Sequence, residues 1–257
     1  MRKAKIYARQ ASYEDFLEFV IRRGHLTQAT LEAPHYDDTI LRFCKAGATS
    51  LDLAASLRPS AYFSHSTAAF LNGLTASLPG ALFLNVEQSK KPKPSASSLS
   101  QASLDRAFSS NQRQSKLFYT YETLTVTMLS GKNSEKLAVE SIAAPNGRSF
   151  STTNLERTLV DLTVRPAYAG GIKAVLGCFR VAQARASMHK LLHILDQLDH
   201  VYPYAQAIGF LGQRAGFSET DLRPLRERIT SLKFHLTHAM KHPAYDETWK
   251  IYYPSDL

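Results

Sequence analysis

The sequence predicts an α+β protein in which a small helical region precedes a larger body of strands and helices. Apolar residues recur at helical spacing over 12–24, alternate as in strands over 117–153, and return to helical spacing beyond that point. Runs of strands followed by runs of helices are typical of the α+β class. We therefore expect a helix-turn-helix-like or winged-helix-like N-terminal domain and a mixed α+β domain with a mostly helical C-terminal part.

The expected domain boundaries follow the same patterns. The N-terminal domain covers 1–58 and the second domain covers 59–257. Within the second domain we expect a β-rich part at 80–151, a helical part at 152–230 and terminal strands at 231–253.

Three short helices are expected in the N-terminal region. Ser12 and Asp15 have the spacing of a capping box ahead of the first helix. Thr27 can cap a second helix, and Asp37 or Asp38 can open a third. Three such helices have the outline of a helix-turn-helix, a motif that reads DNA. The cations expected to contact DNA flank the second and third helices and are Arg22, Arg23, Arg42 and Lys45.

The stretch YFSHSTAAFLNGLT, residues 62–75, is expected to be a turn followed by a helix. Ser64 is placed to cap this helix with its side-chain oxygen, and Gly73 stands where helices often end. The run Ser64, His65 and Ser66 also suggests a nucleophile and a base. Adjacent helical residues do not face one another, and there is no G-x-S-x-G elbow. Capping therefore explains the stretch better than catalysis does.

The middle of the chain carries strand patterns. GALFLNVEQ is a strand candidate, and KLFYTYETLTVTMLSGKNSEKLAVESIAAPNGRSFSTT alternates aromatic and β-branched residues, with turns at SGKN and PNGR. Between them, SKKPKPSASSLSQAS is rich in Pro, Ser and Lys and is expected to be an exposed loop.

The last hundred residues are expected to be mostly helical. Thr153 and Glu156 have capping-box spacing, and Pro166 requires the following helix to end near Arg165. Further helices are expected in YAGGIKAVLGCFRVAQARAS after its two glycines, in SMHKLLHILDQLDH, in YPYAQAIGFLGQRAGFS, and in the short DLRPLRERI. Gly216 is expected to close the third of these. Strands are expected in LKFHLTHAM and TWKIYYP.

The composition is that of a soluble globular protein, with 44% hydrophobic and 21% charged residues. No apolar run approaches the ~18 residues of a membrane span. The basic N-terminus lacks the apolar region of a secretory signal. Cys44 and Cys178 lie in helix-like apolar contexts without disulfide or metal spacing. We therefore expect a cytoplasmic protein with no membrane partner.

The formal net charge of +9 favours a polyanionic partner such as DNA or RNA, although a basic soluble protein without such a partner fits equally well. The excess is concentrated in MRKAKIYAR and in residues 90–116.

No cofactor, metal ion or catalytic constellation is expected. There is no Walker A loop and no G-x-G-x-x-G. His189 and His193 lack the glutamate of an H-E-x-x-H motif, and no Cys or acidic ligand accompanies the regularly spaced histidines from residue 235 to 242. The catalytic alternative is a metal-dependent nuclease that uses Glu87 with Lys90 or Lys91, for which Asp52 is the nearest earlier acidic ligand.

Two motifs, AYFSHSTAAFLNGLT and TNLERTLVDLTVRPAYAGG, together with LDQLDHVYPYAQAIGFLGQRAGF, resemble the AbiEi-type antitoxins of bacterial abortive-infection systems. The resemblance covers roughly residues 57–217. It implies an N-terminal winged-helix DNA-binding domain and a C-terminal antitoxin domain. Members of this family repress their own operon and neutralise a nucleotidyltransferase-like toxin. The short wing usual ahead of SHSTAAF is not evident, and AGATSLDLAASLRPSA stands there instead.

The leading hypothesis is accordingly a non-enzymatic antitoxin that binds operator DNA and acts on a cognate toxin. The polar cluster in LERTLVDLTVRP is either a salt-bridged face that orients its helix or a partner surface. The residues expected at such a surface are Arg157, Asp161, Arg165 and Tyr168. A nucleic-acid-binding sensor or scaffold in a phage-defence complex is a further alternative.

Overall fold

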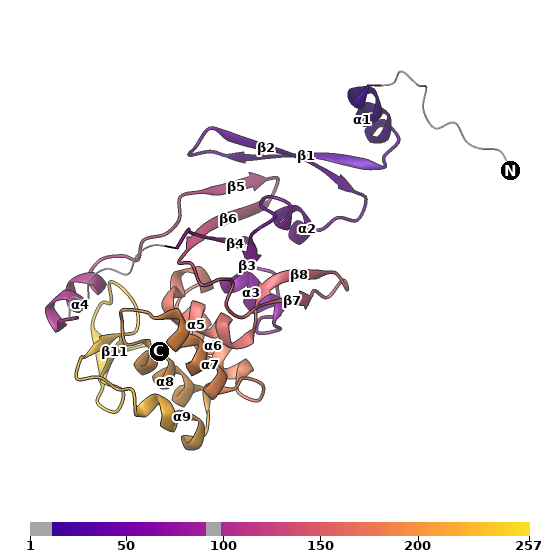
Figure 1. Ribbon diagram of the computed structural model, residues 1–257. Coiled ribbons are helices and arrows are strands. Elements are labelled where there is room, and N and C mark those ends of the chain that lie inside the picture. Colours follow the sequence, from indigo (N-terminus) through magenta and orange to yellow (C-terminus); the bar gives the residue numbers. More distant parts are fainter. Residues whose placement is uncertain (1–11, 91–98) are drawn as a thin grey trace.

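The computed structural model describes residues 12–90 and 99–257. It has the α+β class that the sequence predicts, with helices packed against a large mixed sheet (Figure 1). The cations Arg2, Lys3, Lys5, Arg9, Lys91 and Lys93 lie outside the described residues.

The large sheet has eight strands in the order β2-β1-β5-β6-β4-β3-β8-β7. Its strands are β1 (Leu26–Ala33), β2 (Asp38–Lys45), β3 (Tyr62–Phe63), β4 (Ala81–Glu87), β5 (Phe118–Tyr121), β6 (Leu124–Gly131), β7 (Val139–Ala143) and β8 (Ser149–Thr153). The pairs β4–β6 and β3–β8 are parallel, and the other neighbouring pairs are antiparallel.

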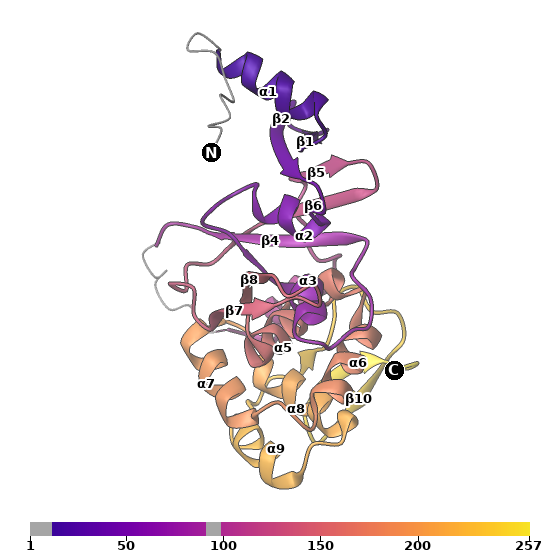
Figure 2. The same cartoon turned by 90° about the vertical axis from the view of Figure 1, so that its right-hand side faces the viewer.

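Most helices gather beside one half of this sheet. The described helices are α1 (Tyr13–Arg22), α2 (Ser50–Ala55), α3 (His65–Leu71), α4 (Gln101–Phe108), α5 (Leu155–Val164), the 3-10 helix η1 (Pro166–Ala169), α6 (Ile172–Ala182), α7 (Met188–Leu198), α8 (Tyr204–Ala215) and α9 (Glu219–Arg226). Figures 1 and 2 both place α1 at the end of the molecule opposite the bundle of α5 to α9.

The hydrophobic interior consists of two clusters. One fills the helical bundle. The other lies between α2 and the sheet, where Leu31 and Leu57 pack with Leu82 and Val126. Hydrophobic contacts therefore cross the expected domain boundary between residues 58 and 59.

The three-helix prediction for the N-terminal region is wrong. The capped first helix is confirmed, because Ser12 and Asp15 form a reciprocal capping box at α1. Residues 26–45 form an antiparallel hairpin instead of two helices, so there is no helix-turn-helix within the described part of 12–58. Alternate residues of β1 are buried, among them Ala29 and Leu31. Cys44 accordingly lies on a strand and not in a helical context.

The predictions for the last hundred residues mostly hold. The helices α5 to α9 overlap the predicted helical segments, and Gly216 ends α8 in the left-handed conformation. The cap of α5 differs, because the Asn154 side chain and not that of Thr153 accepts from the Arg157 amide. The loop predicted through SLSQAS also differs, since α4 begins at Gln101.

A second sheet closes the helical bundle. Its strands are β9 (Phe234–His235), β10 (Pro243–Asp246) and β11 (Ile251–Pro254), in the order β10-β11-β9. Strands at both expected terminal segments are confirmed, and β10 was not anticipated. Just before β11, the fully buried Trp249 lies against the bare backbone of Gly209 in α8 and donates its indole N–H to Gln213.

We predict that Gly209→Ala destabilises the protein by roughly 1–3 kcal/mol or more, because a Cβ at this position would overlap the indole ring of Trp249. Gly177→Ala in α6 is the matched control. A Cβ there meets nothing within 4 Å, so a gain of about 0.5–1 kcal/mol is expected from helix propensity. Urea unfolding followed by the fluorescence of the single tryptophan measures both. Equal shifts in the two variants would contradict the close contact.

Candidate functional site

The two segments that carry the family resemblance form one buried unit. Asn72, directly after α3, donates from its side-chain amide to the Thr153 carbonyl at 2.9 Å and to Thr158 Oγ1 at 3.3 Å. Its own carbonyl accepts from Arg185 at 2.8 Å. Because Asn72 is buried, these bonds fix α3 against the start of α5.

The Ser64–His65 pair lies inside this unit. Ser64 is the N-cap residue of α3, but its side chain makes no capping bond, so the predicted cap is wrong. Its Oγ lies 2.9 Å from His65 Nδ1 instead. His65 has a φ of 52°, and its ring packs edge-on against Tyr168 at 5.1 Å between ring centroids.

This serine–histidine contact is not accessible to a substrate. Ser64 is 2% exposed and His65 is 9% exposed. Burial lowers the pKa of His65 to about 4, with the electrostatic effect of Asp161 opposing the shift and those of Arg165 and Arg157 adding to it. The ring is therefore neutral at pH 7 and acts in packing.

Glu87, at the end of β4, is held by protein donors. It accepts from the Tyr62 hydroxyl at 3.0 Å and from the backbone amides of Ser134 and Lys136 at 3.0 and 3.2 Å. Burial raises the pKa of Glu87, but the hydrogen bonds from Ser134, Lys136 and Tyr62 outweigh it and lower the pKa overall. The carboxylate ties the sheet to the loop that follows β6.

The residues of the nuclease alternative are not brought together. Lys90 pairs with Glu135 at the surface. Asp52 forms the capping box of α2 with the N-cap residue Thr49 and pairs with Arg148, whose guanidinium lies 2.6 Å away. Lys91 lies outside the described residues. No observation of the described part of the chain favours a metal-dependent nuclease at Glu87.

Arg157 is the most deeply placed cation of the predicted partner surface. Its Nε donates to Asp161 Oδ1 at 2.8 Å and its Nη1 donates to the Leu137 carbonyl at 3.0 Å. The side chains of Arg157 and Asp161 are 8% and 12% exposed. Burial alone would lower the pKa of Arg157, but Asp161 raises it overall. The i, i+4 pair predicted from the sequence is confirmed, but it faces the interior.

The remaining two residues of that surface also bind protein groups. Arg165 is partly exposed and donates to the Arg113 carbonyl at 2.7 Å. Tyr168 is buried, and its hydroxyl accepts from the Ser115 amide at 2.8 Å. Arg157 and Tyr168 therefore cannot offer their side chains to a partner in this structure, since both lie inside the contact between sheet and helices.

His200, between α7 and α8, was not singled out from the sequence. Its Nε2 is buried and has no hydrogen-bond partner within the described ranges. Burial lowers the pKa of His200 to about 4, with the charge of Asp161 opposing the shift and those of Arg157 and Lys132 adding to it. It is the second neutral histidine beside the same ion pair.

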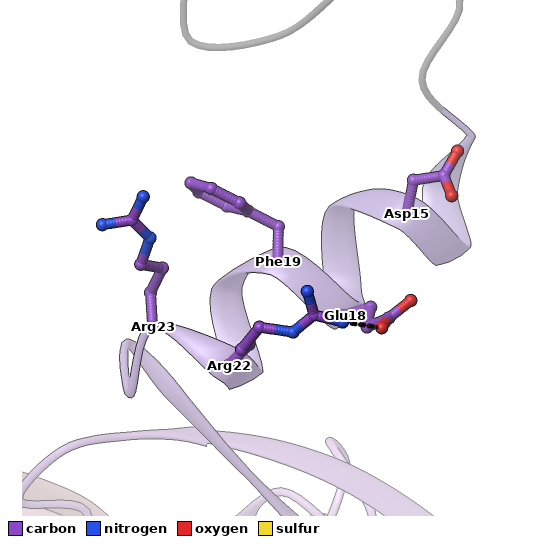
Figure 3. Close-up of a pocket in the computed structure, with 5 residues that line it drawn as sticks. All are labelled: Asp15, Glu18, Phe19, Arg22 and Arg23. Atoms are coloured by element: carbon purple, nitrogen blue, oxygen red, sulfur yellow. Dashed lines mark hydrogen bonds and ion pairs between the residues drawn. The ribbon is translucent and has the colours of Figure 1, made fainter.

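Figure 3 shows the end of α1 that carries two expected DNA contacts. Arg22 forms an ion pair with Glu18, and both side chains are well exposed. The Arg23 guanidinium lies over the Phe19 ring, 5.3 Å from its centroid. Lys45 ends β2 opposite Leu26, close to where α1 enters the hairpin.

Arg42 does not join these cations. Its guanidinium donates to the carbonyl of Ser56 at 3.0 Å and to that of Leu57 at 3.4 Å, both just after α2. Cations are favoured at helix C-termini because the backbone carbonyls there are unsatisfied. Arg42 thus links the hairpin to α2, while its expected contact with DNA stays a prediction.

The segment around these residues is not basic. Residues 12–58 contain five Lys and Arg against seven Asp and Glu, a formal net charge of −2. The positive charge of the chain therefore lies elsewhere.

Within residues 12–90 and 99–257, no group of three or more His, Cys, Asp or Glu side chains is arranged to hold a metal ion. Two histidines of the C-terminal region bind protein atoms, His235 with Asp105 at 2.8 Å and His238 with the Ser110 carbonyl at 3.1 Å. The described part of the chain also contains no helix long and apolar enough to cross a bilayer.

The fold defines an α+β protein with a polar junction between a mixed sheet and a helical bundle. Searches found no protein-family model and no curated protein that matches the chain. Among solved structures, it is similar to the crystal structure of the RV2827C protein from Mycobacterium tuberculosis. The TM-score is 0.56 at 13% identity, over 95% of this chain and 80% of that one. At this identity the likeness shows a shared fold.

We predict that acid destabilises the protein between pH 6.5 and 4. The unfolded chain takes up protons at His65 and His200 near pH 6.5, while the folded chain resists until about pH 4, so stability falls as pH falls through this window. At pH 5 the loss relative to pH 7 should be about 2 kcal/mol for each ring.

Urea unfolding at several pH values measures this loss. His65→Asn removes one titrating ring and retains a residue that tolerates positive φ, so the pH dependence should roughly halve. His193→Asn, at an exposed position of α7, is the control. A pH dependence in His65→Asn as steep as in the control would contradict the assignment.

Proposed function

We propose that this protein is the antitoxin of a bacterial abortive-infection system, that it neutralises a nucleotidyltransferase-like toxin, and that it represses its own operon. One observation carries the proposal. The segments that resemble AbiEi-type antitoxins, far apart in the sequence, fold into one unit joined through Asn72 and the Ser64–His65 region.

The burial of Arg157 and Tyr168 changes which residues can serve the toxin. On this proposal, Arg157 and Tyr168 hold α5 and η1 in place, and accessible neighbours such as Arg165 contact the toxin. The described side chain of Arg165 uses one nitrogen for the Arg113 carbonyl, which leaves other guanidinium donors for a partner.

Operator binding is proposed for α1 and the following hairpin. A helix joined to an antiparallel hairpin presents a rod and a narrow ribbon, shapes that the major groove of DNA admits. Arg23 and Lys45 are the cations there whose side chains have neither a described ion pair nor a described hydrogen bond, whereas Arg22 pairs with Glu18 and Arg42 binds backbone carbonyls. The net charge of −2 over 12–58 means that residues outside this segment must supply further affinity.

We predict that, if a nucleotidyltransferase-like toxin is encoded beside this chain, co-expression of the chain relieves the growth arrest that this toxin causes. Arg165→Ala should weaken this relief while the thermal transition stays within a few degrees of wild type. Arg223→Ala, exposed on α9, is the matched control and should relieve arrest fully. Failure of the wild-type chain would reject the antitoxin function, and full relief by Arg165→Ala would reject the assigned contact.

We further predict that the chain retards its upstream DNA in a gel-shift assay, more strongly at low salt than at high salt. Arg23→Ala and Lys45→Ala should each weaken binding several-fold and lower the salt slope by about one. Arg42→Ala should instead lower thermal stability, because it removes the bonds to the end of α2. No shift at low salt would refute the repressor function.

A further inference from the structure

Three exposed cations follow one another from the end of α4 to the start of β5, and the preceding acid, Asp105, is bound to His235. From Arg106 to Tyr121 the chain contains three cations, Arg106, Arg113 and Lys116, and no Asp or Glu. All three are exposed, and none forms an ion pair with a described residue. Cations that no internal acid neutralises are available to an external anion.

The segment that carries them is rigidly attached. The Ser115 amide donates to the Tyr168 hydroxyl at 2.8 Å and the Ser115 hydroxyl donates to the Met128 carbonyl at 2.6 Å. Gln112 donates to the Val164 carbonyl at 2.9 Å, and Arg165 donates to the Arg113 carbonyl at 2.7 Å. The segment is thus held by two bonds to its backbone and two from its side chains, along η1, α5 and β6.

The side chains between the cations are also suited to phosphate. The exposed positions of residues 109–116 are all polar and are Ser109, Ser110, Asn111, Arg113, Gln114 and Lys116. Hydroxyl, amide and guanidinium donors are the groups that contact nucleic-acid backbones. Protein interfaces instead centre on buried apolar and aromatic residues, and no exposed position of this run carries one.

We propose that residues 106–116, together with Arg165, form a second surface of the protein that binds the phosphate backbone of a nucleic acid without reading its sequence. Figure 1 shows α4 far from α1, so this surface is separate from the proposed operator contacts. The surface also carries positive charge, whereas residues 12–58 have a formal net charge of −2. The proposal does not depend on the antitoxin function.

The test is fluorescence anisotropy of a labelled random-sequence duplex, and in a second arm of a single-stranded RNA, titrated with the full chain. Arg113→Glu/Lys116→Glu should weaken binding of at least one probe by about tenfold or more and lower the salt slope by about two. Arg180→Glu/Arg223→Glu makes the same change of net charge at exposed positions of α6 and α9, and should weaken binding far less.

The outcomes separate the possibilities. Equal weakening in the two double variants would mean that only net charge matters, and would overturn the proposal. Absence of binding to both probes at low salt would overturn it as well. A selective loss in Arg113→Glu/Lys116→Glu supports it whatever the result with Arg23 and Lys45, because the probes carry no operator and the altered residues lie away from α1. A thermal melt of each variant confirms that the exposed substitutions leave the fold intact.

Discussion

The buried guanidinium of Arg157 is the constraint on which the centre of the molecule depends. A charge removed from water must be paired and fully hydrogen-bonded, and here Asp161 supplies the charge while the Leu137 carbonyl takes another N–H. Leu137 belongs to the same loop whose Ser134 amide binds Glu87 at the end of β4. One ion pair on α5 therefore fixes a loop, and the loop fixes the sheet. The two hydrophobic clusters on either side are joined through polar bonds with defined directions, which set how helices and strands meet.

This arrangement separates two kinds of residue that the sequence presents together. Polar residues in the segments that resemble the antitoxin family form hydrogen bonds inside the protein, as Asn72, Arg157 and Tyr168 do. They specify the fold. The exposed cations Arg113 and Lys116 lie in a stretch that matches no motif, yet the Tyr168 hydroxyl and Arg165 hold its backbone in place. The buried residues thus hold the exposed loop in position, and we expect the exposed residues to contact other molecules.

Sequence patterns predicted best those elements whose signals are local. The capping box at Ser12, the left-handed Gly216 and the apolar stripes of α5 to α8 depend on neighbours within a few residues, and each is found in the structure. The hairpin β1–β2 was missed because Thr27 and Asp38 resemble helix caps, and only pairing across the sheet decides between the two structures. Ser64 has the predicted position and a different role, and the bond of Arg42 to the Ser56 carbonyl was not predicted, since the partners of both residues are set by backbone geometry and tertiary contact. The predicted partner surface includes the buried Arg157 and Tyr168, because the sequence pattern of a helix does not show which of its polar residues other elements cover.

The contact between Gly209 and Trp249 has a consequence for the order in which the molecule is completed. A ribosome delivers α8 about forty residues before the indole ring that covers its backbone. During that interval the helix has a groove where the ring will lie, and the Gln206 side chain, which binds the carbonyls of Trp249 and Lys250, has no partner there yet. The contacts that cover Gly209 and bind the Gln206 side chain to the carbonyls of Trp249 and Lys250 can therefore form only after those two residues have been synthesised. A nascent chain that lacks the second sheet would therefore expose the backbone of α8 at Gly209 and the Gln206 side chain, which the complete protein buries.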